Sequence, residues 1–444
     1  MSRRFPSARS LLFAVLLAAS AVRLALVVER WKDPPAWDER INSRNLSAIH
    51  QAGAYRPQNR WYGGLSYLPQ TLLLELGERL HRTVPQVPAM FGRRNVVTAA
   101  GFSLCLVLQA AYGVASLGLL ARVARRFVGD WGATIATAVV AALPQHLHAS
   151  STFKPDILLL VTTLWTLDRT FAALGRPSAR RFAWVGLGVG LTAATKLNGA
   201  VVATPLIVGA AVWMWRRRGQ PDRGKARRRF LGFALLAAAL SVATFALLTP
   251  DVAAQLRWAR RGVDLYRYKA KKAGEAEGFS PLRMLAQVAD PIYLGRAGGA
   301  LAGVCAIWWL GAAAAATARK GLGRPGSRSI VLILAAFPAA YLLQFAASPR
   351  AKANHLLEIA PLAVVAIVVV ATWGLRRVRR WPRWRPVVVP VVLGVCLAAQ
   401  GLAAARLAAE VKPRLRRPAA SRARPAAATE TPAVPAPPAG RDGS

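Results

Sequence analysis

Cysteine and acidic residues are both scarce in this chain. The three cysteines, Cys105, Cys305 and Cys396, each lie inside an apolar run with no CxxC pair and no nearby set of histidine ligands. We interpret them as small core residues, which say nothing about the redox compartment. The chain also lacks a P-loop ending in Gly-Lys-Ser or Gly-Lys-Thr, so nothing indicates a nucleoside triphosphate held in such a loop.

Long apolar runs are what the sequence has in abundance. Hydrophobic residues make up 54% of the 444 residues, and the mean hydropathy is +0.31. Runs near 20 residues match the thickness of the hydrocarbon core, so we predict an all-α, polytopic membrane bundle of about eleven spans. The predicted spans are 11–28, 99–121, 131–148, 156–173, 182–196, 198–215, 230–249, 297–318, 329–347, 355–374 and 386–405.

The charge of +41, from 60 basic and 19 acidic residues, would suggest a nucleic-acid partner in a soluble protein. Here most basic residues lie between apolar runs, where they set topology and meet anionic lipid headgroups, so we expect no nucleic acid. With a cytoplasmic N-terminus, eleven of the 19 acids fall in two outside loops, residues 29–95 and 250–296. We assign residues 1–405 to one transmembrane bundle and residues 406–444 to a basic, then Pro/Ala-rich, disordered tail.

The first outside loop carries adjacent acids, Asp38 and Glu39, just past the first span. Pro34 and Pro35 stop the preceding helix, and residues 38–51 predict a short helix lying at the membrane interface. Asp38 would stand at its N-terminal end, where the helix dipole stabilises a carboxylate. Asp38 is then either a simple helix cap or a catalyst, and its position alone favours neither.

Several short stretches resemble the polyprenyl-phosphate-sugar-dependent glycosyltransferases of the GT-C fold, the group that includes protein O-mannosyltransferases and lipid A aminoarabinose transferases. The matching stretches are residues 37–40 with the Gly53 and Pro57 turn, 62–67, 153–156, 194–199, 349–350 and 354–361. Family members often have a proline where Gly63 or Gly64 stands. The resemblance implies a lipid-linked donor, consistent with the lack of a P-loop, and an acceptor that is a glycan, a lipid or a protein.

The resemblance also implies roles for individual residues. Asp38 would be the base that takes the proton of an acceptor hydroxyl, Glu39 a metal partner of Asp38 or a solvated residue, and Asp156 a second acid that could hold the acceptor or help to bind a divalent cation. The leaving phosphate would meet positive groups, and the acceptor or the loop would use further side chains. The candidates for binding the phosphate are Lys196, Arg350, His355 and Lys154. The candidates for the acceptor or the loop are Arg40, Tyr62 and Tyr67.

Plainer interpretations stand beside these. Asp156 follows Pro155 and could simply begin a helix, and the basic residues could snorkel to lipid headgroups. His146 and His148 lie two apart, so on a helix they would point to different sides and make a poor metal pair. Gly186 and Gly190 predict close helix packing rather than a nucleotide loop.

The main rival function is a transporter or flippase of lipid-linked or anionic solutes, which would show charges near mid-membrane and two related halves. No such repeat is apparent in the sequence. Abundant alanine and arginine indicate a GC-rich bacterial genome, hence a multi-pass protein of the plasma membrane with its site facing the periplasm or exterior.

Overall fold

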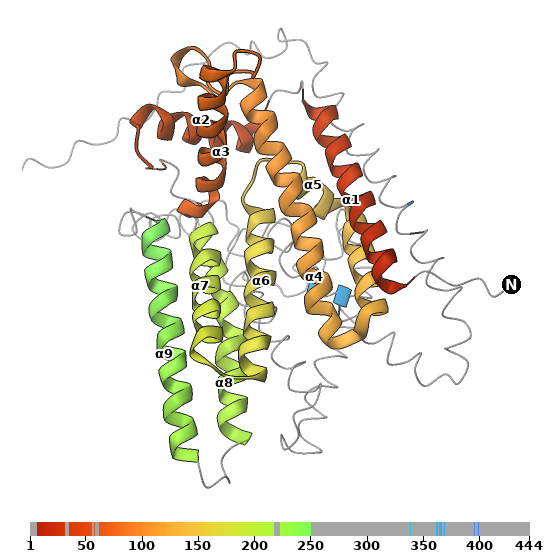
Figure 1. Cartoon of the computed structure of the whole chain (residues 1–444), viewed down its shortest axis with the longest axis vertical. Helices are drawn as coiled ribbons and strands as arrows, with labels where there is room; N and C mark the ends of the chain where they lie inside the picture. The colour runs from red at the N-terminus through yellow and green to blue at the C-terminus, as the bar shows by residue number, and fades with distance from the viewer. Residues whose placement is uncertain are drawn as a thin grey trace, which may run out of the picture.

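The computed structural model describes residues 7–31, 35–55, 57, 62–216 and 223–249, with single positions at 338, 361–362, 364–365, 368, 395 and 398. Within these residues the fold is helical, and the one β-type contact is an isolated bridge between Phe91 and Val97. The helices (Figure 1) are α1 (Ala8–Arg30), α2 (Trp37–Ala52), η1 (Gly64–Ser66), α3 (Leu68–Thr83), η2 (Arg93–Asn95), α4 (Ala99–Ala142), α5 (Pro144–Ser150), α6 (Asp156–Gly175), α7 (Ala179–Thr195), η3 (Leu197–Ala203), α8 (Thr204–Arg216) and α9 (Arg223–Leu248).

Each predicted span up to residue 249 falls on helical structure, although the spans 131–148 and 198–215 each cover parts of two elements. Five described helices are long and apolar enough to cross a membrane, namely α1, α4, α6, the η3–α8 segment and α9. Helix α7 has 17 residues, which is near the lower limit for a span. The predicted spans from residue 297 onward, the second outside loop and the tail lie outside the described residues.

Helix α4 is a helical hairpin rather than one straight rod. Its backbone leaves helical geometry at Gly129, where φ is 70°, a conformation that glycine adopts without a steric cost. The two arms match the predicted spans 99–121 and 131–148. The second prediction was too long, because Pro144 begins the separate helix α5.

The bundle is packed through small residues. Helix α6 lies against α4 and α7, and α7 in turn packs along α9. A side chain at Gly186 would collide with the carbonyl of Ala237, and one at Gly190 would lie 2.6 Å from the carbonyl oxygen of Ser241, both on α9. The predicted packing role of these two glycines is confirmed.

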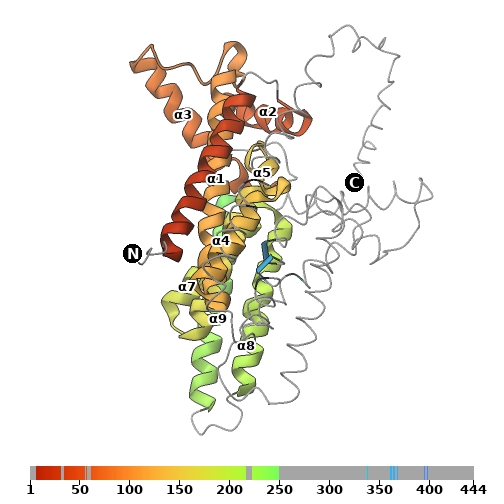
Figure 2. The same cartoon turned by 90° about the vertical axis from the view of Figure 1, so that its right-hand side faces the viewer.

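A layer formed by α2, α3 and the connecting turns covers one end of the bundle (Figures 1 and 2). We call it the outer layer, after the orientation that the sequence predicts. The predicted helix over 38–51 is confirmed as α2, which ends at Gly53 in the left-handed conformation with φ 58°. The layer is attached to the bundle at Gly63 and Gly64, where an added Cβ would collide with the carbonyls of Ala194 and Leu248 respectively. The Gly63 N–H also donates to the Thr195 carbonyl at 3.0 Å.

Candidate active site

The first turn of α2 uses its two acids in different ways. The residue that caps the helix is Ala36, whose backbone N–H donates to Oε2 of Glu39 at 2.8 Å. Asp38 is the second residue of the helix and makes no capping bond in the described structure. The interpretation of Asp38 as a helix cap is therefore wrong, since the carboxylate that accepts from the backbone at this terminus belongs to Glu39.

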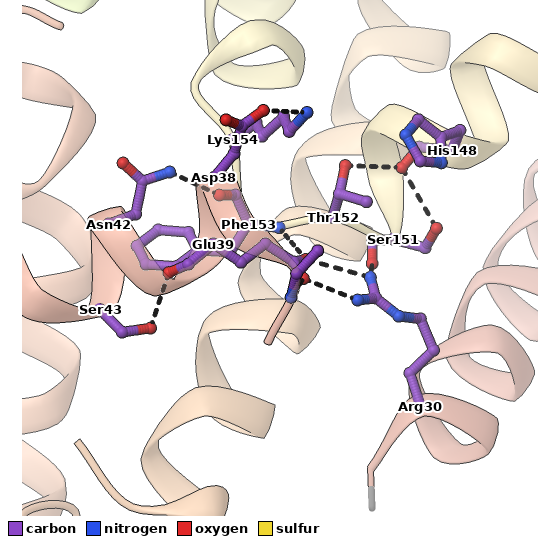
Figure 3. Close-up of polar contacts among 11 residues, drawn as sticks. Arg30, Asp38, Glu39, Asn42, Ser43, His148, Ser151, Thr152, Phe153 and Lys154 are labelled. Atoms are coloured by element: carbon purple, nitrogen blue, oxygen red, sulfur yellow. Dashed lines mark hydrogen bonds and ion pairs between the residues drawn. The ribbon is translucent and has the colours of Figure 1, made fainter. Parts of the chain in front are cut away.

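Glu39 is fully buried and joins three segments of the chain. Arg30, at the end of α1, donates to both carboxylate oxygens, at 3.1 Å from Nη1 and 2.8 Å from Nη2 (Figure 3). The backbone N–H of Phe153 donates to Oε1 at 2.9 Å. The interpretation of Glu39 as a solvated residue is wrong, because its carboxylate is enclosed and fully engaged.

The backbone of the loop between α5 and α6 is held by side chains from α2 and α1. Asn42 donates to the carbonyl of Phe153 at 2.7 Å, and Tyr67 donates to Oδ1 of Asn42 at 2.9 Å. Arg30 donates to the carbonyl of Ser151. These bonds fix the path of the chain immediately before Lys154.

Asp38 projects from α2 toward Lys154, and the two form an ion pair with 2.7 Å between Oδ2 and Nζ (Figure 3). The Asp38 side chain remains 40% exposed and that of Lys154 20% exposed. The pair is thus the accessible part of an otherwise closed network, and an incoming ligand could reach both partners.

A second lysine–carboxylate pair follows two residues along the chain. Asp156 begins α6, as the helix-start interpretation predicted, and its Oδ1 accepts from Nζ of Lys196 at 3.1 Å. Lys196 ends α7, in extended geometry. Both side chains are largely buried, at 16% exposed for Lys196 and 9% for Asp156.

One member of each pair, Lys154 and Asp156, acts electrostatically on His148 of α5. Desolvation by the surrounding protein lowers the pKa of His148, although part of its surface is exposed, and the positive charges of Lys154 and Arg30 lower it further. The charges of Glu39 and Asp156 act in the opposite direction. Two acids and two bases therefore lie close enough to influence one imidazole.

The histidines on α5 face opposite ways, as predicted. His146 is buried, and its Nδ1 accepts from Nη2 of Arg23 on α1 at 2.6 Å while its Nε2 lies 2.8 Å from the hydroxyl of Ser116. Within the described residues, no group of three or more His, Cys, Asp and Glu side chains is placed to hold a metal ion.

The remaining candidates are distributed around this centre. Arg40 is exposed on α2, Tyr62 is partly buried and packs against the apolar cluster beneath α2, and Tyr67 is buried with its hydroxyl bonded to Asn42. Arg350 and His355 lie outside the described residues. The sequence interpretation did not include Arg30 and Asn42; the position of Arg30 at the end of an apolar run was the only signal for it.

Comparison with known proteins gives the fold a name. A family model described as dolichyl-phosphate-mannose-protein mannosyltransferase matches residues 95–237, which is less than half of the chain. No curated protein sequence matches significantly.

Several solved structures have a similar fold. One is an oligosaccharyltransferase of Archaeoglobus fulgidus, with a TM-score of 0.55 and 14% sequence identity; the match covers 89% of this chain and 53% of that protein. The chain therefore spans about half the length of that protein. ArnT of Cupriavidus metallidurans bound to undecaprenyl phosphate gives a TM-score of 0.53 and 17% identity over 90% of this chain and 77% of ArnT. These likenesses confirm the all-α GT-C fold that the sequence predicted.

Proposed function

We propose that this chain is an integral-membrane glycosyltransferase that moves a sugar from a polyprenyl-phosphate donor to an acceptor hydroxyl. The observation that carries the proposal is the partly exposed Asp38–Lys154 ion pair. Lys154 precedes Asp156 by two residues, and Asp156 pairs with Lys196 at the start of α6. The family likeness supports it, because the matched residues 95–237 include Lys154, Asp156 and Lys196.

The proposed site faces the periplasm or exterior of a bacterial plasma membrane, as the distribution of basic residues predicts. The donor enters from the lipid, and the acceptor, a hydroxyl of a glycan, a lipid or a protein, arrives from the aqueous side. Oligosaccharyltransferase AglB of Archaeoglobus fulgidus has been solved with an inhibitory peptide and a dolichol-phosphate. Because this chain has a similar fold, we propose that it too uses a lipid-phosphate donor.

The proposed reaction inverts the configuration at the anomeric carbon of the sugar. The acceptor oxygen attacks the anomeric carbon and forms a new C–O bond, while the bond from that carbon to the phosphate oxygen breaks and polyprenyl phosphate leaves with the electron pair. The hydroxyl proton passes to Asp38. In our proposal the donor phosphate attracts Lys154 away from Asp38, and Lys196 stabilises the leaving phosphate. Asp156 orients Lys196 and stands where an acceptor hydroxyl or a divalent cation could be held.

The test is transfer of labelled sugars from a panel of polyprenyl-phosphate donors in membranes with matched amounts of protein. The wild type should transfer and Asp38→Asn should not, while the variant keeps its thermal unfolding temperature and donor binding. Asp130→Asn is the matched control, since Asp130 is 48% exposed and paired with Arg125. A wild type that transfers no sugar of the panel would overturn the proposal and favour the transporter; transfer by Asp38→Asn would remove Asp38 as the base.

A further inference from the structure

A second charged cluster lies at the other end of the bundle, far along α4 and α6 from the outer layer. Asp168, near the end of α6, accepts from Arg122 of α4 at 3.0 Å, from Arg126 of α4 at 2.5 Å and from its neighbour Arg169 at 2.8 Å. We call these four residues the inner arginine cluster. With one acid and three arginines, the cluster carries an excess of positive charge.

The acid is buried and the bases are not. The Asp168 side chain is 2% exposed, whereas those of Arg122, Arg126 and Arg169 are 53%, 34% and 28% exposed. Arg126 also donates to the backbone carbonyl of Asp168 at 3.3 Å. Asp168 therefore acts as an internal anchor that fixes one edge of each guanidinium and leaves part of each group accessible.

This arrangement differs from that of ordinary basic residues in a loop. A free arginine loses considerable side-chain entropy when it binds, whereas a guanidinium already held by a buried carboxylate has less to lose. Guanidinium groups also match the oxygens of a phosphate in paired hydrogen bonds. Arg180 offers a comparison, because it is exposed on the same side of the bundle without a described ion pair.

The position of the cluster identifies the phosphate that it could meet. Arg122 and Arg126 lie just before the Gly129 turn of the α4 hairpin, at the end that the positive-inside rule assigns to the cytoplasm. Trp165 lies beside the cluster, with Cζ of Arg169 6.0 Å from the ring centroid and the Trp184 ring 6.0 Å away. Tryptophan favours the boundary between hydrocarbon and headgroups, so the arginines stand at the depth of the inner-leaflet phosphates.

We propose that the inner arginine cluster is a binding site for the phosphate headgroup of an anionic phospholipid of the cytoplasmic leaflet. Arg122 and Arg126 bind the phosphate oxygens, Asp168 positions the arginines, and the acyl chains run along the apolar surface beside Trp165. Basic pockets between helices on the cytoplasmic side bind anionic headgroups in other membrane proteins. This site is separate from the proposed glycosyl-transfer site and does not depend on that activity.

The experiment uses the purified full-length chain in phosphatidylcholine vesicles that contain increasing fractions of brominated phosphatidylglycerol, with brominated phosphatidylcholine as the neutral probe. Bromine quenches nearby tryptophan, and subtracting the signal of a Trp165→Phe variant isolates Trp165. The wild type should be half-quenched at a lower fraction of the anionic probe than of the neutral one. Arg122→Gln combined with Arg126→Gln should shift that midpoint by about fivefold or more, given the usual strength of one basic residue near an anionic surface.

The control removes the same charge elsewhere, with Arg180→Gln combined with Arg181→Gln. Equal shifts in both double variants would overturn the proposal, because only the surface potential would then matter. Asp168→Asn separates the two explanations further: it makes the cluster more positive, so a purely electrostatic attraction would strengthen, whereas a positioned site weakens. If Asp168→Asn fails to fold, Arg122→Lys keeps the charge without the fork and should still weaken binding. Displacement of the lipid by inorganic phosphate at similar concentration would also contradict a headgroup site.

Discussion

Arg30 on α1 and Glu39 on α2 form a two-pronged ion pair, with contacts of 3.1 Å and 2.8 Å, in which the carboxylate is completely buried. The pair joins the end of the first apolar helix to the start of the outer layer. It also reaches the loop before α6 through the Phe153 N–H, so three parts of the proposed site depend on one carboxylate.

Glu39→Gln should therefore destabilise the protein strongly. The substitution leaves the Arg30 guanidinium without its counter-charge in a mostly enclosed position, and breaking such a pair costs about 3 kcal/mol or more. Thermal unfolding in detergent measures the loss. Asp130→Asn, which breaks an exposed pair, should cost less than about 1 kcal/mol; similar losses in the two variants would mean that burial of Glu39 contributes little.

Lys154→Gln should separate stability from donor binding. The Asp38–Lys154 pair is partly exposed, so its loss should change the unfolding free energy by no more than about 1 kcal/mol. If Lys154 meets the donor phosphate, KM for the polyprenyl-phosphate sugar should rise while KM for the acceptor stays the same. Lys154→Arg should restore much of the donor affinity. An unchanged donor KM in Lys154→Gln would assign the lysine to positioning Asp38 alone.

Gly63→Ala should damage the attachment of the outer layer. The added methyl group would collide with the Ala194 carbonyl, and backbone atoms cannot move aside as a flexible side chain can, so we expect a loss of about 3 kcal/mol. Gly118→Ala is the matched control, because a Cβ there meets nothing within 4 Å, and alanine favours a helix interior by up to about 1 kcal/mol. Equal unfolding temperatures for the two variants would contradict the close approach at Gly63.

His148 should make the fold sensitive to mild acid. Its pKa is lower in the folded protein than the ordinary value of 6.5, so below that pH the unfolded chain binds more protons than the folded one. Stability is then lost as the pH falls through about 6.5 toward the folded-state pKa. His148→Gln should flatten the dependence of unfolding temperature on pH between about 5 and 7. A slope that His148→Gln leaves unchanged would rule out this source.

The sequence was enough to place the helices but not to assign the partners of the acids. Apolar runs located α1 and α6 to within a few residues, because hydrocarbon thickness sets their length. The prediction missed the break between α4 and α5, because Pro144 lies inside an apolar run and hydropathy alone treats that run as one span. The roles of Asp38 and Glu39 could not be separated, because the difference lies in Arg30, Phe153 and Lys154, which only the folded chain brings to them.

The glycines at 63 and 64 are one departure from the pattern of the family that the sequence resembles, and the structure gives a physical reason for small residues there. A proline at Gly63 would lack the N–H that donates to Thr195. The backbone of α7 lies too close to Gly63, and that of α9 too close to Gly64, for a larger residue to fit. Such a constraint is invisible in sequence, because it depends on helices far along the chain.

That attachment also sets an order of assembly. Gly63 and Gly64 leave the ribosome well before Ala194 and Leu248, on the order of ten seconds earlier at usual rates of synthesis. During that interval the layer of α2 and α3 lacks its close contacts with α7 and α9. Nascent chains stopped before α9 should therefore leave the segment around Gly64 open to protease added on the side of the membrane that this layer faces, and chains released after α9 should protect it. The proposed site would then be completed only after α9 has been made.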